Sequence, residues 1–482
     1  MDTRILVVIV TGAVVLLGTV AFSLVIARRH STAADWQTGG RALPMYVVVG
    51  TQLATLMGGG VLVGHVGIGY ENGWSAVTYG LLSAIGLIPM IIMARWLRQG
   101  GMSSLPDVLV KLYGPSRLMA VITIVMSVVI PFGWLISNLV AFGNLFALIT
   151  GLSVKVLIPI FGLLCLGFVI PAGLTSVAWT DFVFGVGMLV LAVLTTVFSM
   201  REAGGWSVIQ ASVPSEAVSF PEGMVAVGGV TVLFWLFAVM PGNLTNQQVY
   251  QRVFAADSTR GARTGIAVAA LLYLGALVWA SMMGLTVHAL KPDLDNPEMA
   301  MGWLLTQIPT WLLALFAAFI ISTIMSTASS AVQSVVVNLT KDIYQEHIAP
   351  DADPKRMLSL SRWASVGVVA IGVGLAVFYQ QALQWLVMTF AYSVSAMLMP
   401  ILVGFALRRT RFLTRSGAVA GMLAGVATAG VAHASGTEVP YVAFGMAGSL
   451  VGLILVSAVT RDGNTATDGD AEERPAVESS GH

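Results

Sequence analysis

The amino-acid sequence predicts an all-α integral membrane protein with about thirteen transmembrane helices. Of its 482 residues, 57% are hydrophobic and only 10% are charged, whereas a soluble protein carries about 25% charged residues. The apolar residues gather in long segments, and a helix of about 20 apolar residues crosses a bilayer. The near-zero formal net charge of +1 says nothing about nucleic acid, and no nucleic-acid partner is expected.

The apolar segments follow one another along almost the whole chain. The first is interpreted as a retained span, because it is too long for a signal-peptide core and ends in Arg28, Arg29 and His30. The segments lie near residues 5–27, 45–70, 74–97, 117–150, 155–177, 180–200, 224–248, 262–289, 310–340, 359–380, 384–407, 416–433 and 440–460.

Basic residues indicate an orientation in the membrane. With the N-terminus outside, all but four of the 24 Lys and Arg residues fall in cytoplasmic loops or the C-terminal tail, including Arg252. The exceptions are Arg4, Lys155, Arg201 and Lys291. This bias follows the positive-inside rule. We therefore predict a multi-pass protein of the cell inner (plasma) membrane, with its N-terminus outside and its C-terminus cytoplasmic.

Two spans contain residues that interrupt a helix. The second holds Gly58-Gly59-Gly60, and the seventh holds Pro241-Gly242-Asn243. Both sequences destabilise a continuous helix, and freed backbone groups are tolerated at membrane depth only where they line a cavity or site. Because the breaks lie five spans apart, they favour inverted repeats with a site between them. A proline kink or a packing contact is the alternative for each break alone.

Hydroxyl groups form a stripe in the uncharged segment Trp311–Thr340. Thr323, Ser326, Thr327 and Ser330 recur at i, i+3, i+4 and i+7, so their hydroxyls share one helix face. Neutral oxygens inside a membrane helix suit a small hard cation, which prefers oxygen ligands. The alternative is that these hydroxyls bond to carbonyls of their own helix or pack at helix contacts.

Asp181 is a carboxylate at the predicted start of the sixth span. A charge at a helix centre costs about 2.5–3.5 kcal/mol on insertion scales, and a helix-capping role near the interface is the alternative. In the predicted topology Ser329 and Ser330 lie in the inner half of the ninth span, on the side where Asp181 enters. We therefore expect the carboxylate and these hydroxyls at one depth.

With these features together, the sequence resembles the sodium:solute symporter family, which includes bacterial proline, sialic acid and galactose transporters. The resemblance covers nearly the whole chain, and its motifs are specific in combination. They are Met325-Ser326-Thr327-Ala328-Ser329-Ser330, Lys341-Asp342-Ile343-Tyr344, Gln251-Arg252-Val253-Phe254-Ala255-Ala256-Asp257, Ala54-Thr55 with Gly64, Gly67 and Tyr70, Thr180-Asp181, and Gly417-Ala418-Val419-Ala420-Gly421-Met422.

The resemblance implies a LeuT-like fold of two inverted five-helix repeats, with one extra N-terminal helix and two extra C-terminal helices. Residues 1–44 would form the extra N-terminal helix and a cytoplasmic loop. Residues 45–200 would form core helices 1–5, and residues 201–408 core helices 6–10. Residues 409–461 would form the two C-terminal helices. Residues 462–482 would form a disordered cytoplasmic tail, in line with their polar, acidic composition.

The resemblance also implies sodium-binding residues. The family's common site maps onto the carbonyls of Ala54, Met57 and Thr323 and the hydroxyls of Ser326 and Thr327. A second site, found in members resembling the sialic acid transporters, maps onto Asp181, Ser326, Ser329 and Ser330. Na⁺ is then the expected coupling ion, with no organic cofactor and no other metal.

The resemblance identifies the solute-binding residues less directly than the sodium-binding residues. No arginine faces inward from the fourth span, so the carboxylate clamp of the sialic acid transporters is absent. Gln248 stands where the sugar transporters have a tyrosine gate. A structural role between helices is the alternative for each candidate. The candidates for polar contacts with the solute are His65, Asn138, Asn243, Thr245, Asn246, Gln247 and Gln248.

The expected function is sodium-coupled symport. The chain would import a small neutral or zwitterionic organic solute, such as an amino acid or related metabolite, by alternating access with two sodium ions. The alternatives are a proton-coupled permease in which Asp181 or His65 titrates, and a solute-binding receptor without transport. An enzyme is not expected, because no HExxH, P-loop or GxSxG pattern appears. The partners would be the solute, sodium and the lipid bilayer, with a monomer as the functional unit.

Overall fold

The structure is a computed structural model that describes residues 3–29, 41–169, 174–410 and 412–460. The predicted tail at 462–482 and most of the loop after the first helix lie outside these ranges. Within them the chain is helical, and its one strand-like feature is an isolated bridge between Leu43 and Ala256. The all-helical prediction is therefore confirmed.

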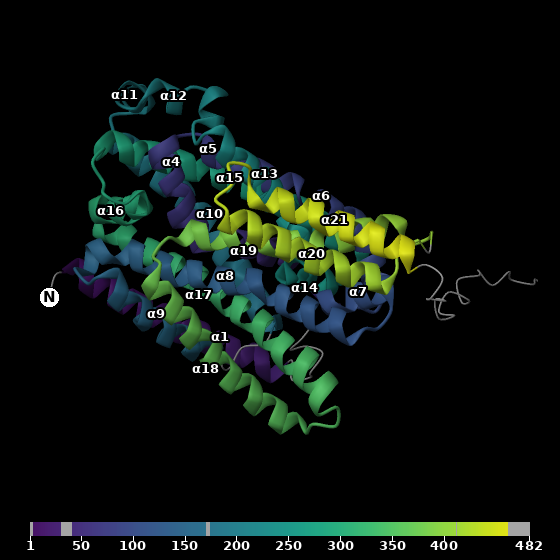
Figure 1. Ribbon diagram of the computed structural model, residues 1–482. Helices are drawn as coiled ribbons and strands as arrows, with labels where there is room; N and C mark the ends of the chain where they lie inside the picture. Colours follow the sequence, from purple (N-terminus) through teal and green to yellow (C-terminus); the bar gives the residue numbers. More distant parts are fainter. Residues whose placement is uncertain (1–2, 30–40, 170–173, 411, 461–482) are drawn as a thin grey trace, which may run out of the picture.

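The helices pack into an elongated bundle, in which segments far apart in the sequence lie side by side, such as α1 (Thr3–Arg29) and α17 (Thr310–Val337) (Figure 1). The first half of the chain holds α1 (Thr3–Arg29), α3 (Met45–Met57), η2 (Gly60–His65), α4 (Val66–Asn72), α5 (Ser75–Ile85), α6 (Ile88–Gln99), α7 (Leu105–Tyr113), α8 (Arg117–Thr150), α9 (Val154–Val169), α10 (Leu174–Glu202), α11 (Trp206–Ser212), α12 (Ser215–Val218) and η3 (Glu222–Val225). The second half holds α13 (Gly229–Gly242), η4 (Asn243–Thr245), α14 (Gln247–Ala255), α15 (Thr259–Leu290), η5 (Pro297–Met299), α16 (Ala300–Gln307), α17 (Thr310–Val337), η6 (Asn338–Ile348), α18 (Pro354–Phe378), α19 (Ala382–Leu407), α20 (Arg415–Ala434) and α21 (Tyr441–Val459).

Many of these helices are suited to a membrane. In the described part of the chain, nine are long and apolar enough to span one, and up to eleven if each of two bent pairs counts as one span. The apolar part of α1 (Thr3–Thr19) and α9 are shorter. The multi-pass prediction is confirmed, while the count of thirteen stays a prediction.

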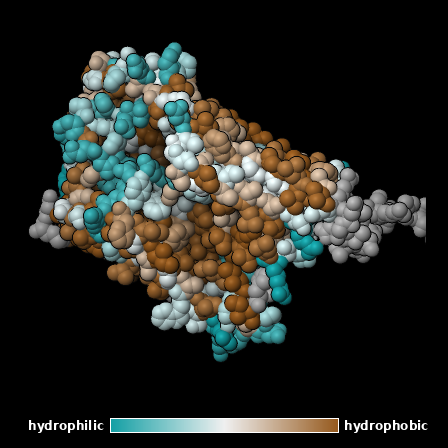
Figure 2. Space-filling view, in the orientation of Figure 1, coloured by the Kyte–Doolittle hydropathy of each residue, from teal (hydrophilic) through white to brown (hydrophobic). Residues whose placement is uncertain are grey.

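The outer surface fits a lipid environment. Figure 2 shows a broad hydrophobic face along the bundle, with hydrophilic residues gathered at the end that carries α11, α12 and α16. Leu17, Leu163 and Leu271, on three different helices, are each about 70% exposed, at 69%, 71% and 72%. Soluble proteins rarely expose large apolar patches, so this surface indicates contact with hydrocarbon.

Both predicted helix breaks are present. The chain bends by 54° between α3 and the segment that resumes at Gly60, because Gly58 adopts a non-helical ψ of −169°. The second bend, of 41°, lies between η4 and α14. It occurs at Asn246 (φ −92°, ψ 107°) rather than at Pro241-Gly242, which remain helical. The proline removes a hydrogen bond of its helix, but the chain turns only four residues after Gly242.

The first break lies against α17, which is enclosed by other helices. Every residue of α17 from Ile320 to Val337 is buried, and the helix packs on α1, α8 and α10. A Cβ added at Gly58 would lie 2.8 Å from the Thr327 methyl carbon and 3.0 Å from Trp134 on α8. Glycine therefore permits both the non-helical turn and the close approach of α3, α8 and α17.

Candidate functional site

Backbone and hydroxyl oxygens converge where the broken helix meets α17. The Thr327 hydroxyl lies 3.1 Å from the Ala54 carbonyl oxygen and 2.9 Å from the Thr323 carbonyl oxygen. A hydroxyl has one proton to donate, so these two carbonyls share it. The structure thus brings together three of the five oxygens expected at the common ion site.

The other two members of this set are placed differently. Met57 is the last residue of α3, directly before the break, and is buried. The Ser326 hydroxyl donates instead to Oδ1 of Asp181. Ser326 therefore connects the oxygens at the break with a second group of polar side chains on the same face of α17.

Asp181 is the centre of this second group. Its Oδ2 accepts a hydrogen bond of 2.6 Å from the Thr51 hydroxyl on α3, and the residue is 1% exposed. Asp181 reaches the hydroxyl face of α17 at Ser326, whereas the expectation named Ser329 and Ser330, which bond to the Ser326 carbonyl and to Arg252. The helix-capping alternative is wrong, because α10 begins at Leu174 and Asp181 lies well inside it.

Arg252 completes the second group, which we call the carboxylate cluster: Thr51, Asp181, Arg252, Ser326 and Ser330. Its Nη2 lies 3.9 Å from Oδ2 of Asp181 and donates to the Ser330 hydroxyl at 3.0 Å. Its Nε donates to the Thr51 hydroxyl at 3.4 Å.

The assignment of Arg252 to a cytoplasmic loop was wrong. The residue lies in α14 and is 1% exposed. The count of basic residues placed it in a loop because it follows a span closely. The signal that could have identified it is Asp181 itself, since charged residues inside a membrane usually pair with one another.

Some hydroxyls of α17 also bond within their own helix, as the alternative interpretation proposed. Ser329 donates to the Ser326 carbonyl at 2.8 Å, and Thr327 bonds to the Thr323 carbonyl. Ser329, expected at the second ion site, therefore lies beside the carboxylate cluster with its proton directed to the backbone. Local bonding and a shared polar face coexist on this helix.

Three solute candidates have their recorded bonds within the fold. Asn138 accepts from the Gly59 backbone N–H at 2.8 Å and donates to the Trp134 carbonyl at 2.6 Å, so it braces the first break. Asn246 caps α14 by accepting from the Gln248 N–H at 3.0 Å. Thr245 donates to the Gly242 carbonyl at 3.0 Å.

Four other candidates keep polar atoms free. Among the described residues, the following buried atoms have no hydrogen-bond partner: Nε2 of His65, Oδ1 of Asn243, Nε2 of Gln247 and both amide atoms of Gln248. A buried polar atom without a partner is costly, so each of these atoms needs a partner that the described residues do not supply, such as an ordered water or a bound molecule.

The remaining polar atoms of these candidates are engaged. His65 Nδ1 lies 2.8 Å from the Gly60 carbonyl oxygen. The amide nitrogen of Asn243 bonds to Ser83, and Oε1 of Gln247 accepts from the Leu105 N–H at 2.7 Å.

Gln52 was missed by the sequence analysis. It lies on α3 one residue after Thr51, is fully buried, and has both amide atoms without a partner among the described residues. The pattern of polar and apolar residues along the helix could not identify Gln52, because every residue from Gly50 to Met57 is buried. Gln52 and Gln248 thus present unused amide groups on the two broken helices.

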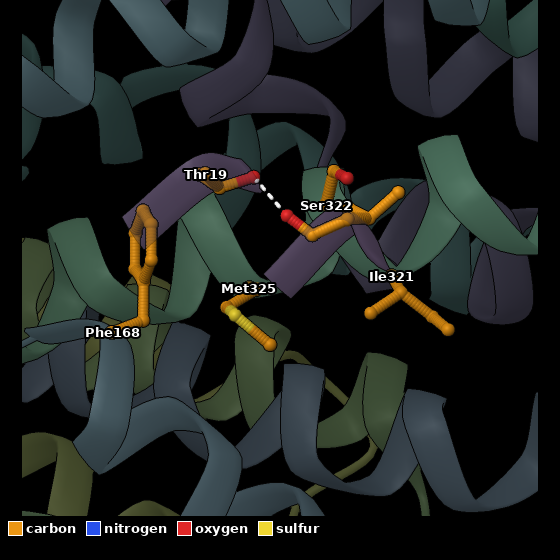
Figure 3. A pocket seen from close by; sticks show the side chains of 6 residues that line it. Thr19, Phe168, Ile321, Ser322 and Met325 are labelled. Atoms are coloured by element: carbon orange, nitrogen blue, oxygen red, sulfur yellow. Dashed lines mark hydrogen bonds between the residues drawn. The ribbon is translucent and has the colours of Figure 1, made fainter. Parts of the chain in front are cut away.

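A small pocket elsewhere does not serve as the site. It lies between α1, α9 and α17 and is lined by Val15, Thr19, Phe168, Ile321, Ser322 and Met325 (Figure 3). The Thr19 hydroxyl donates to the Val15 carbonyl at 2.7 Å, and the Ser322 hydroxyl to the Ala318 carbonyl at 2.6 Å. Both hydroxyl protons are therefore used locally, and the rest of the lining is apolar.

Curated proteins similar to this chain include bacterial solute transporters, some of which are named as sodium-coupled. The sodium/glucose cotransporter of Vibrio parahaemolyticus is 24% identical over 453 residues, covering 82% of this chain and 79% of that protein. The high-affinity proline transporter PutP of Bacillus subtilis is 26% identical over 463 residues, covering 90% and 94%. A sodium/proline symporter of Staphylococcus aureus is 26% identical over 421 residues, covering 81% and 79%.

Solved structures show the same fold. A Na⁺-coupled sialic acid symporter superposes with a TM-score of 0.77 at 19% identity, covering 96% of this chain and 98% of that one. The nucleobase-cation-symport-1 transporter Mhp1 gives a TM-score of 0.60 at 13% identity, covering 89% and 95%. These neighbours have the LeuT fold. The family model of the sodium:solute symporters matches residues 36–425, and the chain therefore belongs to the sodium:solute symporter family.

Proposed function

We propose that this chain is a sodium-coupled symporter that imports a small organic solute by alternating access. The observation that carries the proposal is the position of the Thr327 hydroxyl, within 3.1 Å of the carbonyl oxygens of Ala54 and Thr323. A sodium ion would accept lone pairs from these oxygens, and Met57 and Ser326 would complete its ligands. Because its ligands come from the broken helix and from α17, the ion would stabilise one relative arrangement of these two helices.

A second sodium ion would bind at the carboxylate cluster. Asp181 supplies the negative charge, and Ser326, Ser329 and Ser330 supply neutral oxygens. Support comes from the bond between Ser326 and Asp181. Further support is the description of the sialic acid symporter as having a novel Na⁺ site. Sharing Ser326 would make the two sites interdependent.

The solute would be neutral or zwitterionic. The free polar atoms on the broken helices belong to uncharged side chains, chiefly the amides of Gln52 and Gln248. Amides both donate and accept hydrogen bonds, which suits an amino acid or a related polar metabolite. The similarity to proline and glucose transporters points to the same size class.

Two ions would supply enough energy for accumulation. One charge moving through about 100 mV is worth roughly 2.3 kcal/mol, and a tenfold sodium gradient adds about 1.4 kcal/mol. Two ions would therefore provide about 7 kcal/mol, which supports roughly 10⁵-fold accumulation at the limit.

The proposal includes an arrangement in the membrane. The chain would have thirteen spans in the cell inner membrane, with its N-terminus outside and its C-terminus in the cytoplasm. The monomer would be the functional unit. With this orientation α11, α12 and α16 lie on the outer side, and α7 and the end of α14 on the cytoplasmic side.

Uptake into proteoliposomes tests the function. A panel of radiolabelled solutes including L-proline and D-glucose is offered to the full chain under an inward sodium gradient, with potassium or choline in place of sodium as controls. Sodium-dependent accumulation is expected for at least one solute. Uptake driven equally by a pH gradient without sodium would favour the proton-coupled alternative, and solute binding without accumulation would favour a receptor. The variant Thr327→Ala, measured in the same assay, removes the hydroxyl of the proposed ion site. Ser322→Ala, on another face of α17, is its matched control and should keep wild-type uptake.

A further inference from the structure

The guanidinium of Arg252 lies among oxygens suited to a small cation. Its Nη2 is 3.0 Å from the Ser330 hydroxyl and 3.9 Å from Oδ2 of Asp181, and its Nε is 3.4 Å from the Thr51 hydroxyl. Carboxylate and hydroxyl oxygens are the ligands that hard cations prefer. Asp181 and Ser330 are also two of the residues proposed for the second sodium ion.

The carboxylate cluster carries one negative charge, on Asp181, which can neutralise one cation. Asp181 and Arg252 are each 1% exposed and Ser330 is 2% exposed, so water does not screen the charges. A sodium ion added beside the guanidinium would leave two positive charges against one carboxylate. Like charges at such distances repel strongly when solvent is excluded. Binding of sodium therefore requires the guanidinium to leave.

The contact between Arg252 and Asp181 is not that of a locked structural ion pair. Structural pairs of arginine with a carboxylate are frequently bidentate, whereas here only Nη2 approaches Oδ2, at 3.9 Å. The carboxylate instead accepts from the hydroxyls of Thr51 and Ser326. Arg252 thus neutralises Asp181 without satisfying its lone pairs, as an exchangeable cation would.

The side chain of Arg252 is also flexible enough to leave the cluster. Arg252 lies in the last turn of α14, and its Nη1 donates to the carbonyl of Gln248, four residues earlier, at 3.2 Å. The side chain therefore lies back along its own helix. Arginine has several rotatable side-chain bonds, so rotamer changes can carry the guanidinium towards the end of α14 while the backbone stays in place.

We propose that the Arg252 guanidinium takes the place of the second sodium ion in this conformation, and that the ion binds at Asp181 only when the guanidinium withdraws. This inference rests on the proposed sodium coupling. Arg252 would weaken the second ion's affinity in the resting state and would neutralise Asp181 once that ion leaves. The empty carrier could then change conformation without an uncompensated charge in the membrane.

Binding of radioactive sodium to the purified full chain in nanodiscs tests the proposal without a known solute. In wild type, one ion should bind tightly and a second weakly. In Arg252→Gln the second ion should bind at least about tenfold more tightly, since the guanidinium 3.9 Å from the carboxylate is gone. A folded Arg252→Gln protein whose second ion binds no more tightly than in wild type would overturn the proposal.

Added guanidinium provides a readout that a merely structural arginine would not affect. In Arg252→Gln, tens of millimolar guanidinium chloride, far below the molar concentrations that unfold proteins, should displace one of the two sodium ions. The same addition should leave sodium binding to wild type almost unchanged. Equal displacement in both proteins, or in neither, contradicts the exchange.

Two further variants keep the test decisive. Arg98→Gln is the matched control, because Arg98 bonds to the carbonyls of Phe254 and Asp257 just after Arg252 and has no recorded contact with Asp181. Its sodium affinities should equal those of wild type. If Arg252→Gln does not fold, Arg252→Met is measured instead. Methionine keeps an extended side chain but removes the positive charge beside Asp181, so a gain in affinity for the second ion is again expected, and no gain overturns the proposal.

The outcomes separate this inference from the proposed function. Wild-type protein that binds no sodium and shows no sodium-dependent uptake refutes the function itself. Sodium-dependent uptake together with unchanged sodium binding in the Arg252 variants refutes only the exchange.

Discussion

The Thr51 hydroxyl on the broken helix α3 donates a 2.6 Å hydrogen bond to the Asp181 carboxylate on α10. This bond joins the carboxylate cluster to the helix whose break forms the candidate ion site. Ser326 makes the corresponding link from α17, since it donates to the other oxygen of Asp181. The position of Asp181 is thus determined by both helices on which the proposed coupling depends.

Thr51→Val should weaken the binding of the second sodium ion by about tenfold, because a hydrogen bond to a charged group is worth about 1.5–3 kcal/mol. Valine keeps the shape of threonine but leaves Oδ2 of Asp181 without this donor. The affinity is measured with radioactive sodium on the purified chain. Thr55→Val is the control, since Thr55 bonds to the carbonyl of Thr51 in its own helix at 2.7 Å. Equal losses in both variants would show that the effect is not specific to Asp181.

Thr327→Val should abolish sodium-dependent uptake, whereas Thr327→Ser should retain most of it. The hydroxyl lies within 3.1 Å of the carbonyls of Ala54 and Thr323, and valine removes only this oxygen while preserving the branched shape. Initial uptake rates over a range of sodium concentrations distinguish the variants. If valine and serine behaved alike, the hydroxyl would not be an ion ligand.

Residue type and spacing were enough to predict several features of the site. Gly58-Gly59-Gly60 predicted a break, because three consecutive glycines have a low helix propensity, and the structure bends there by 54°. The spacing of Thr323, Ser326 and Thr327 placed their hydroxyls on one face. The depth of Asp181 in the predicted topology brought it to that face, as its bond with Ser326 confirms.

Other features depend on tertiary contacts that the sequence does not encode locally. Pro241-Gly242 indicated a bend, but this pair is helical and the chain turns at Asn246. A lone arginine after a span resembles an ordinary loop cation, so Arg252 was placed outside the core. On α3 the residues from Gly50 to Met57 are all buried. Periodicity therefore could not indicate that Gln52 keeps unused polar atoms.

Asn138→Leu should destabilise the protein by about 1–3 kcal/mol, because it leaves the buried Gly59 N–H without an acceptor. The loss is measured as a lower thermal unfolding temperature of the purified chain. If Asn138 acts only as a brace, Asn138→Ser, which keeps a small neutral group that can both accept and donate a hydrogen bond, should recover part of the stability. A variant that keeps wild-type stability but loses affinity for the solute would instead indicate that Asn138 binds the solute.

Glu298 should make stability depend on pH. It lies in η5, outside the candidate membrane spans, and caps α19 by accepting from the N–H groups of Ala382 (2.9 Å) and Leu383 (3.1 Å). Burial raises the pKa of Glu298 above its usual 4.5, against the opposing effect of these bonds and of one from Asn144. The folded protein therefore holds this proton more tightly than the unfolded chain does.

The sign of the effect follows from this raised pKa. The contribution of Glu298 to the free energy of unfolding is fully present below about pH 4.5 and is lost as pH rises through the raised folded-state pKa. Glu298→Gln does not titrate, so the difference in unfolding temperature between wild type and this variant should change in favour of the variant as pH increases from about 4 to 8. Asp295→Asn, an exposed residue of the same loop, is the control and should follow wild type. A difference between wild type and Glu298→Gln that stays constant over this range would show that the Glu298 proton is not linked to folding.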